Sequence, residues 1–120
     1  MIEESVEVTF PRTRACVVAV RGDQDTTTAP EMERLLSELL VVSDLMVVDV
    51  SEADFVDSSF LRNVLVADRR AKEQDKVFRL QVGTAPIVRR AFEVSGVLER
   101  LAVVGSRDEA LASAHDGAKP

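Results

Sequence analysis

The residues with the most distinctive chemistry are Asp57-Ser58-Ser59, three short polar side chains directly before a predicted helix. Oxygens of Asp and Ser accept hydrogen bonds from the free backbone N–H groups of a helix's first turn. A serine there can also carry a phosphate, because the helix dipole and those N–H groups stabilise negative charge. Phosphorylation would add about 1.5 to 2 negative charges to the surface. The spacing leaves both interpretations open, a helix cap and a modification site.

A second polar run, Gly22-Asp23-Gln24-Asp25-Thr26-Thr27-Thr28, also precedes a predicted helix. Thr28 can cap that helix and Glu31 can reach back to it, which is the pattern of a capping box. Pro30 suits the first turn. The run is therefore either a recognition surface or an ordinary loop with a cap, and its residues alone do not decide.

Residues for enzymatic chemistry are few. The only histidine, His115, lies in the predicted tail, so a Ser-His-Asp arrangement lacks a base. One cysteine, Cys16, and one histidine give no ligand spacing for zinc or iron. The five glycines form neither of the phosphate-binding loop motifs, and the loop carboxylates Glu52 and Asp54 are expected to be solvated. We predict no enzymatic activity, no metal and no cofactor.

Composition narrows the binding partners. The formal net charge is −6, from 15 basic and 21 acidic residues, which disfavours nucleic acid and anionic membrane surfaces. No apolar stretch approaches the roughly 20 residues of a membrane span. The acidic start Met1-Ile2-Glu3-Glu4 is unlike a secretory signal, so cytoplasmic localisation is expected. Cys16 lies in an apolar run and is expected to be a small buried hydrophobe.

Apolar periodicity predicts the elements that position these residues. Strands are expected over residues 6–10, 15–20, 45–50, 77–82 and 101–104. Helices are expected over residues 28–40, from about Phe60 to Glu73, over 84–95 with Gly96 ending the helix, and from 106 onward. The order β-β-α-β-α-β-α-β-α predicts an α/β fold with a mixed sheet of about five strands and about four helices. One domain is expected, with its core over about 5–113 and a flexible tail at 114–120.

Several stretches in this order resemble the STAS-domain family of anti-sigma factor antagonists. The first loop and helix start match at Val20-Arg21-Gly22-Asp23-Gln24-Asp25 and at Thr28-Ala29. The second loop and helix start match at Phe55-Val56-Asp57-Ser58-Ser59-Phe60-Leu61. Residues 86–98 and 108–111 are similar to the family's last two helices. The resemblance covers about residues 5–113 and implies a single STAS domain.

The resemblance implies a partner switch. The serine after the aspartate, Ser58, would be the phosphoacceptor of a GHKL-type anti-sigma factor kinase, with Ser59 as the alternative. Unmodified protein would bind the anti-sigma factor and free the sigma factor, and a PP2C-type phosphatase would reset the modified form. Direct contact with nucleic acid and insertion into a membrane are not expected. Whether the protein forms a weak homodimer is left open. The partner-binding residues it implies are Asp23, Asp25, Thr26, Asp57, Ser58, Ser59, Phe60 and Arg62.

Two positions depart from the family pattern. Phe60 stands where the family usually has glycine, so its ring is expected either to contact a particular partner or to obstruct kinase docking. Gln24 replaces an apolar residue of the first loop. Alternative functions are a STAS subunit that acts as a scaffold in an ABC-type transport assembly or a stress-signalling complex without phosphorylation, and a STAS domain that senses a small ligand or nucleotide.

Overall fold

The computed structural model describes residues 6–111. Its strands are β1 (Val6–Arg12), β2 (Ala15–Gln24), β3 (Leu45–Val56), β4 (Val77–Gln81) and β5 (Val103–Val104), and its helices are α1 (Ala29–Val42), α2 (Ser58–Glu73) and α3 (Pro86–Ser95). A 3₁₀ turn follows at Val97–Glu99, and a further helix begins at residue 107 and reaches the end of the described range. The expected tail at 114–120 lies outside the described residues.

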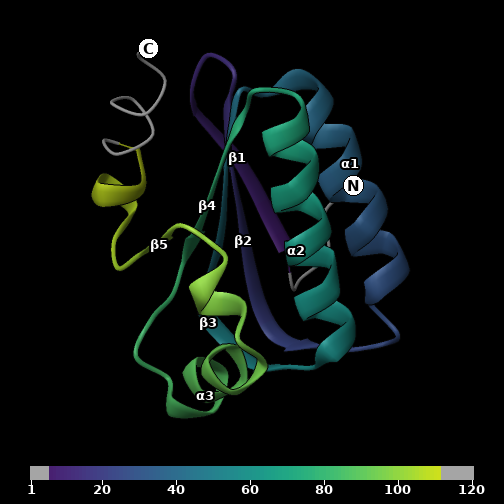
Figure 1. The fold of residues 1–120 in the computed structure, drawn as a ribbon, viewed down its shortest axis with the longest axis vertical. Helices are drawn as coiled ribbons and strands as arrows, with labels where there is room; N and C mark the ends of the chain where they lie inside the picture. Colours follow the sequence, from purple (N-terminus) through teal and green to yellow (C-terminus); the bar gives the residue numbers. More distant parts are fainter. Residues whose placement is uncertain (1–5, 112–120) are drawn as a thin grey trace.

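The five strands form one sheet in the order β1-β2-β3-β4-β5. The β1–β2 pair is antiparallel and the other three pairs are parallel, which confirms the predicted mixed sheet. Helices α1 and α2 lie side by side along the sheet, and α3 lies at the end of the molecule where α2 begins (Figure 1). The carboxyl ends of the parallel strands, the start of α2 and α3 are therefore gathered at one end of the fold.

The core has two parts, because side chains of a strand alternate between the two faces of a sheet. The larger part includes Cys16, Val18 and Val20 of β2 together with the inward faces of the helices. The smaller part includes Ala15 and Val17 and packs against the C-terminal segment. Cys16 is fully buried, which confirms the prediction of a small buried hydrophobe, and this burial raises the pKa of its thiol.

Strands β2 and β3 are longer than the sequence predicts. Residues 21–24 and 51–56, expected to be loops, are parallel partners that end at the pair Gln24–Val56. The loop prediction was wrong because outward-facing polar side chains hide buried positions such as Gln24, Ala53 and Val56 in the sequence. Two shifts in register and the positive φ of 68° at Gly22 make this part of the pairing irregular.

The predicted capping box at α1 is also wrong. Helix α1 begins at Ala29, and the side chain of Thr28 makes no capping hydrogen bond. Its hydroxyl instead donates to the carbonyl of Asp25 at 3.1 Å and accepts from the Asp25 N–H at 3.1 Å. Thr28 therefore stabilises the turn before the helix, and only its backbone carbonyl takes part in α1, by accepting from the N–H of Met32 at 3.0 Å.

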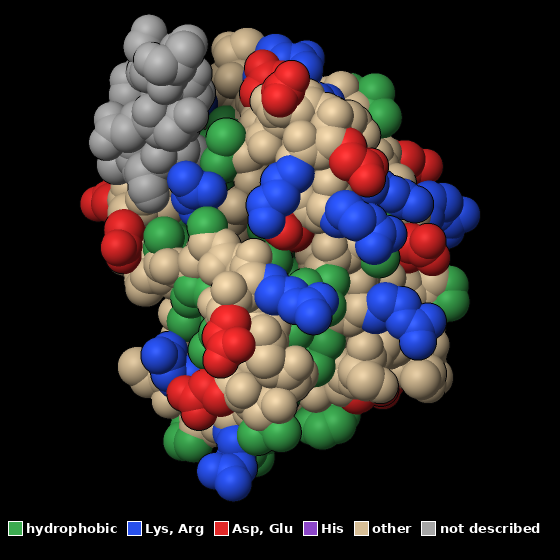
Figure 2. Space-filling model, viewed as in Figure 1, with side chains coloured by type: hydrophobic (Ala, Val, Ile, Leu, Met, Phe, Trp, Pro, Cys, Tyr) green, Lys and Arg blue, Asp and Glu red, His purple; other side chains and the backbone are tan. Residues whose placement is uncertain are grey.

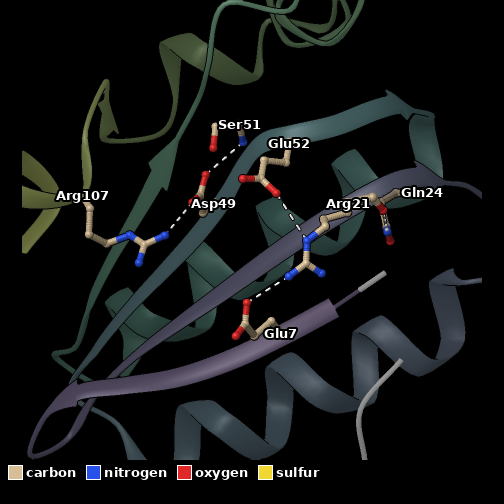
Figure 3. A network of polar contacts seen from close by, with 7 residues as sticks. All are labelled: Glu7, Arg21, Gln24, Asp49, Ser51, Glu52 and Arg107. Atoms are coloured by element: carbon tan, nitrogen blue, oxygen red, sulfur yellow. Dashed lines mark hydrogen bonds and ion pairs between the residues drawn. The ribbon is translucent and has the colours of Figure 1, made fainter. Parts of the chain in front are cut away.

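The sheet face opposite α1 and α2 carries a polar network (Figure 3). Asp49, only 6% exposed, accepts from Arg107 Nη2 at 2.6 Å with one oxygen and from the Ser51 N–H at 2.9 Å with the other. The Nε of Arg107 donates to Gln81 at 3.0 Å. This network attaches the C-terminal segment to the middle of the sheet.

A second set of ion pairs lies on neighbouring strands of the same face. Arg21 of β2 pairs with Glu7 of β1 at 2.9 Å and with Glu52 of β3 at 3.3 Å (Figure 3). All three side chains are 40% or more exposed, so the pairs contribute little stability individually. They give this face alternating charge across three strands.

The substitution Arg107→Gln tests the first network. It leaves a buried acceptor of Asp49 without its charged partner, and we expect the free energy of unfolding to fall by about 1–3 kcal/mol. The measurement is urea denaturation followed by circular dichroism. Arg100→Gln, at an exposed position, is the matched control and should stay within about 0.5 kcal/mol of the parent protein. Equal stability of both variants would show that the Asp49–Arg107 pair does not stabilise the fold.

Candidate functional site

The two polar segments identified in the sequence meet at the carboxyl end of the sheet. The parallel pairing of β2 and β3 runs to their last residues, and the N–H of Asp57 then donates to the carbonyl of Gln24 at 3.1 Å. The end of β2 and the start of α2 are thus joined directly. In open α/β sheets this end of the parallel strands is where functional residues gather.

Asp57 is the residue that caps α2. Its Oδ1 accepts from the backbone N–H groups of Ser59 at 2.9 Å and Phe60 at 3.3 Å, and from the hydroxyl of Ser59 at 2.5 Å. These hydrogen bonds, the one from the Ser59 hydroxyl foremost, lower the pKa of Asp57. Of the three possible capping residues in the sequence, Asp57 is therefore the cap, and Ser58 is the first residue inside the helix.

Ser58 and Ser59 differ in how available their hydroxyl groups are. Ser59 is half-buried and its hydroxyl is bound to the carboxylate of Asp57. Ser58 is exposed, and among residues 6–111 no hydrogen-bond partner of its hydroxyl is found. Of the two serines, Ser58 is thus the one whose oxygen is free to be modified or to contact another molecule.

The other predicted site residues lie around this position. Asp25 Oδ1 accepts from the N–H and the hydroxyl of Thr27, at 3.0 and 2.6 Å, and the hydroxyl bond foremost lowers the pKa of Asp25. The charge of Asp25 opposes the lowering of the pKa of Asp57. Asp25 directly follows Gln24, whose carbonyl accepts from the N–H of Asp57. Asp23 and Thr26 are exposed.

Two residues that depart from the family pattern are buried. Phe60 is 2% exposed and belongs to the main core on the inward face of α2, so the burial of its ring disagrees with both expected roles, contact with a partner and obstruction of kinase docking. Gln24 is fully buried, and its amide donates to the carbonyl of Arg21 at 3.2 Å and accepts from the Thr28 hydroxyl at 3.3 Å. Both side chains therefore support the site from within the core, and the buried ring of Phe60 does not cover the surface around Ser58.

Sequence reasoning missed an open groove beside Ser58. Its volume is about 490 Å³, and it lies between the β3–α2 junction and α3. Three of its side chains are large, apolar and well exposed, namely Phe55 at 44%, Ile87 at 65% and Val94 at 76%. The residues that matter for its chemistry are Phe55, Ser58, Leu61, Ile87, Arg90 and Val94.

A sequence signal for the groove exists on α3. Val88 and Phe92 are the inward-facing residues of this helix. Ile87, Ala91 and Val94 form a second apolar stripe at positions i, i+4 and i+7, which share one side of a helix. A short helix with two apolar stripes buries one against its own fold and leaves the other for a partner.

Within residues 6–111 there is no group of three or more His, Cys, Asp or Glu side chains placed to hold a metal ion. Over the same range no helix is both long and apolar enough to cross a bilayer. What the geometry provides is a free hydroxyl at the start of a 16-residue helix and an apolar groove next to it.

The substitution Asp57→Ala tests the cap. At neutral pH we expect a loss of about 1 kcal/mol in unfolding free energy, because two backbone N–H groups lose their acceptor. The pKa of Asp57 is lowered by folding, so its contribution is present above the unfolded pKa of about 3.9 and disappears as the pH falls through the lower folded value. The difference between variant and parent should therefore shrink in acid.

Urea denaturation between neutral and acid pH measures this difference. Asp54→Ala is the control, since Asp54 is an exposed carboxylate of the same segment outside the cap. It should change the unfolding free energy by less than about 0.5 kcal/mol at every pH. A gap between Asp57→Ala and the parent that stays constant in acid would contradict the role of the ionised carboxylate.

A family model described as "Mlab, STAS domain" matches residues 8–105. Among solved structures, an anti-sigma factor antagonist from Mycobacterium paratuberculosis is similar, with 22% identity, a TM-score of 0.82 and 92% of each chain covered. No curated protein sequence matches this chain.

Three further structures have the same fold. SpoIIAA in its unphosphorylated form shares 18% identity and a TM-score of 0.79, with 92% of this chain and 96% of that chain covered. The phosphorylated form of Bacillus SpoIIAA has 16% identity and a TM-score of 0.67, with 90% and 97% covered. A sulfate transporter family protein from Wolinella succinogenes has 14% identity and a TM-score of 0.70, with 89% of each chain covered. At these identities the likeness concerns the fold.

Proposed function

The chain belongs to the STAS domain family, and from that premise we propose that it is an anti-sigma factor antagonist switched by phosphorylation of Ser58. The observation that carries the proposal is the exposed Ser58 hydroxyl at the start of α2, beside an open apolar groove. Anti-sigma factor antagonists of the same fold, one of them solved with and without phosphate, support it. The unmodified protein binds an anti-sigma factor and thereby frees a sigma factor.

The switching step is a phosphoryl transfer. The anti-sigma factor, a serine kinase of the GHKL type, passes the γ-phosphoryl group of ATP to Ser58 Oγ, which loses its proton, and ADP leaves. A phosphatase of the PP2C type hydrolyses the ester with water and returns Ser58 and inorganic phosphate. No side chain of this chain needs to do chemistry beyond offering the hydroxyl, which agrees with the scarcity of catalytic groups.

Electrostatics explains why the modification would break a complex. A phosphate on Ser58 adds about 1.5 to 2 negative charges next to Asp57, in a region that also holds Asp25. Like charges brought together and desolvated at an interface cost several kcal/mol. A change of about 3 kcal/mol shifts an affinity by roughly a hundredfold, which is enough for a switch.

A second candidate function is that of a STAS subunit in a membrane transport or stress-signalling complex. The observation that favours it is the likeness to the sulfate transporter family protein from Wolinella succinogenes. In this role the groove would contact another subunit and Ser58 would stay unmodified. Co-purification with a transporter rather than with a soluble kinase discriminates between the two functions.

Substitutions at Ser58 test the proposed switch. We expect Ser58→Ala to bind the cognate anti-sigma factor as the unmodified protein does, and Ser58→Glu to bind at least about tenfold more weakly, which corresponds to about 1.4 kcal/mol. Isothermal titration calorimetry measures both affinities. Ser59→Glu is the matched control for the added charge, and Ser59→Ala is the control for loss of a hydroxyl.

The same preparation can be incubated with ATP and the anti-sigma factor, followed by mass-spectrometric mapping of the phosphate. The expected site is Ser58, and Ser58→Ala should remove the signal while Ser59→Ala retains it. Equal affinities of Ser58→Ala and Ser58→Glu, or a segment 57–59 that stays unmodified, would overturn the switch and favour the scaffold function.

A further inference from the structure

Arg90 is the cationic side chain that α3 contributes to the groove beside Ser58. It lies three residues after Ile87 and four before Val94, in the middle of the exposed apolar stripe of that helix. Within residues 6–111 no carboxylate pairs with Arg90, whereas its neighbour Arg89 lies 4.0 Å from Glu93 and donates to the Gly83 carbonyl. Arg90 is exposed, so its guanidinium can pair in a fork with an anion placed in the groove.

The anion that the proposed function supplies is the phosphate on Ser58. Ser58 and Arg90 line the same groove from opposite elements, α2 and α3. The Asp57 carboxylate, close to Ser58 in sequence, is bound to the N–H groups and the hydroxyl at the start of α2. A phosphate on Ser58 is repelled by the charge of Asp57, which also lines the groove, and is attracted by the charge of Arg90 on the α3 side of the groove.

We propose that Arg90 binds the phosphate on Ser58 and that this ion pair closes the apolar groove. The inference rests on the proposed phosphorylation of Ser58. A guanidinium holds two phosphate oxygens in a fork, and the exposed apolar side chains of Phe55, Ile87 and Val94 flank the groove that Ser58 and Arg90 both line. When Arg90 lies across the groove, a partner can no longer reach the apolar side chains that line it. The phosphate then acts by occupying the groove as well as by repelling acidic groups.

Other basic residues provide the alternatives and the controls. Figure 2 shows Lys and Arg side chains spread over the helical face, across α2, although the chain as a whole carries a net charge of −6. Arg62 lies four residues after Ser58 on α2 and is the competing candidate for the phosphate, although it does not line the groove. Arg69 is exposed further along α2 and lines a different hollow, so Arg69→Gln is the matched control.

The test places phosphoserine at position 58 by site-specific incorporation, so no kinase is needed. Phosphorus NMR then gives the second pKa of the phosphate, ordinarily about 6, in the parent protein and in three variants. An arginine partner favours the dianion, so we expect Arg90→Gln to raise that pKa by about 1 unit at low ionic strength. Arg69→Gln should leave it unchanged, and Arg62→Gln should shift it by less than Arg90→Gln.

Closure of the groove has its own reporter. The chain has two isoleucines, Ile2 and Ile87, so labelling of isoleucine methyl groups gives one signal from the groove, which Ile87→Val assigns by its disappearance. We expect phosphoserine at 58 to shift the Ile87 methyl signal and Arg90→Gln to abolish most of that shift. The circular dichroism spectrum of each variant confirms that the fold is retained.

The outcomes separate this inference from the proposed function. The same phosphate pKa in the parent and in Arg90→Gln, or a larger effect of Arg62→Gln, overturns the role of Arg90 and leaves the switch at Ser58 standing. A second outcome is that Arg90→Gln raises the pKa of the phosphate while the affinity for the anti-sigma factor is the same with and without the phosphate. This outcome supports the ion pair and overturns the proposed function.

Discussion

The structure around the site depends on one carboxylate, that of Asp57. Its Oδ1 accepts three hydrogen bonds from Ser59 and Phe60, the second and third residues of α2, while its own backbone N–H donates to the carbonyl of the last residue of β2. The first set fixes where the helix begins, and the last bond fixes where that beginning lies relative to the sheet. The carboxylate accepts from the free backbone N–H groups of Ser59 and Phe60 in the first turn. The side chain of Ser58 is therefore not needed as a cap, and it is exposed.

This arrangement places the helix cap on Asp57 and leaves the side chain that we propose is phosphorylated, Ser58, outside the cap. Phosphorylation of a serine that capped the helix would change the group that accepts from the free N–H groups, and such a cap is worth about 1 kcal/mol. Here the cap belongs to Asp57, and the hydroxyl of Ser59 is also taken up by it. A charge placed on Ser58 therefore alters the surface while the hydrogen bonds that start α2 stay in place. The helix dipole adds a small stabilisation for a negative charge at this position.

Much of the fold could be predicted from the sequence. The continuous apolar runs at 15–20 and 45–50 specify strands buried on both faces, and the apolar periodicity of 60–73 specifies a helix with one buried face. The exceptions share a cause. Residues 21–24 and 51–56 alternate between buried and solvated positions next to a left-handed Gly22, so their polar members resemble loops in the sequence. Only the pairing partner, which lies about 30 residues away, shows that they are strands.

The site was predictable in its position and only partly in its geometry. The capping pattern places Asp57, Ser58 and Ser59 at a strand-to-helix junction, yet three adjacent capping residues do not reveal which of them is the cap. Its position beside these polar residues suggested that Phe60 lies at the surface. Its place on α2 instead turns the ring toward the sheet, and the ring is buried in the core. The groove was beyond reach of periodicity alone, since it forms between β3 and a helix about 30 residues later.

The polar face of the sheet gives the site a rigid base without taking part in it. Asp49 lies buried where the parallel strands β3 and β4 pair, held by Arg107 from the C-terminal segment (Figure 3). A buried carboxylate with a charge-assisted bond costs free energy if its partner leaves, so the segment after β5 stays attached to the sheet. The helical face carries the groove and Ser58, and the opposite face carries this network. A charge gained on one face can therefore change what the protein binds while the network that fastens the other face is undisturbed.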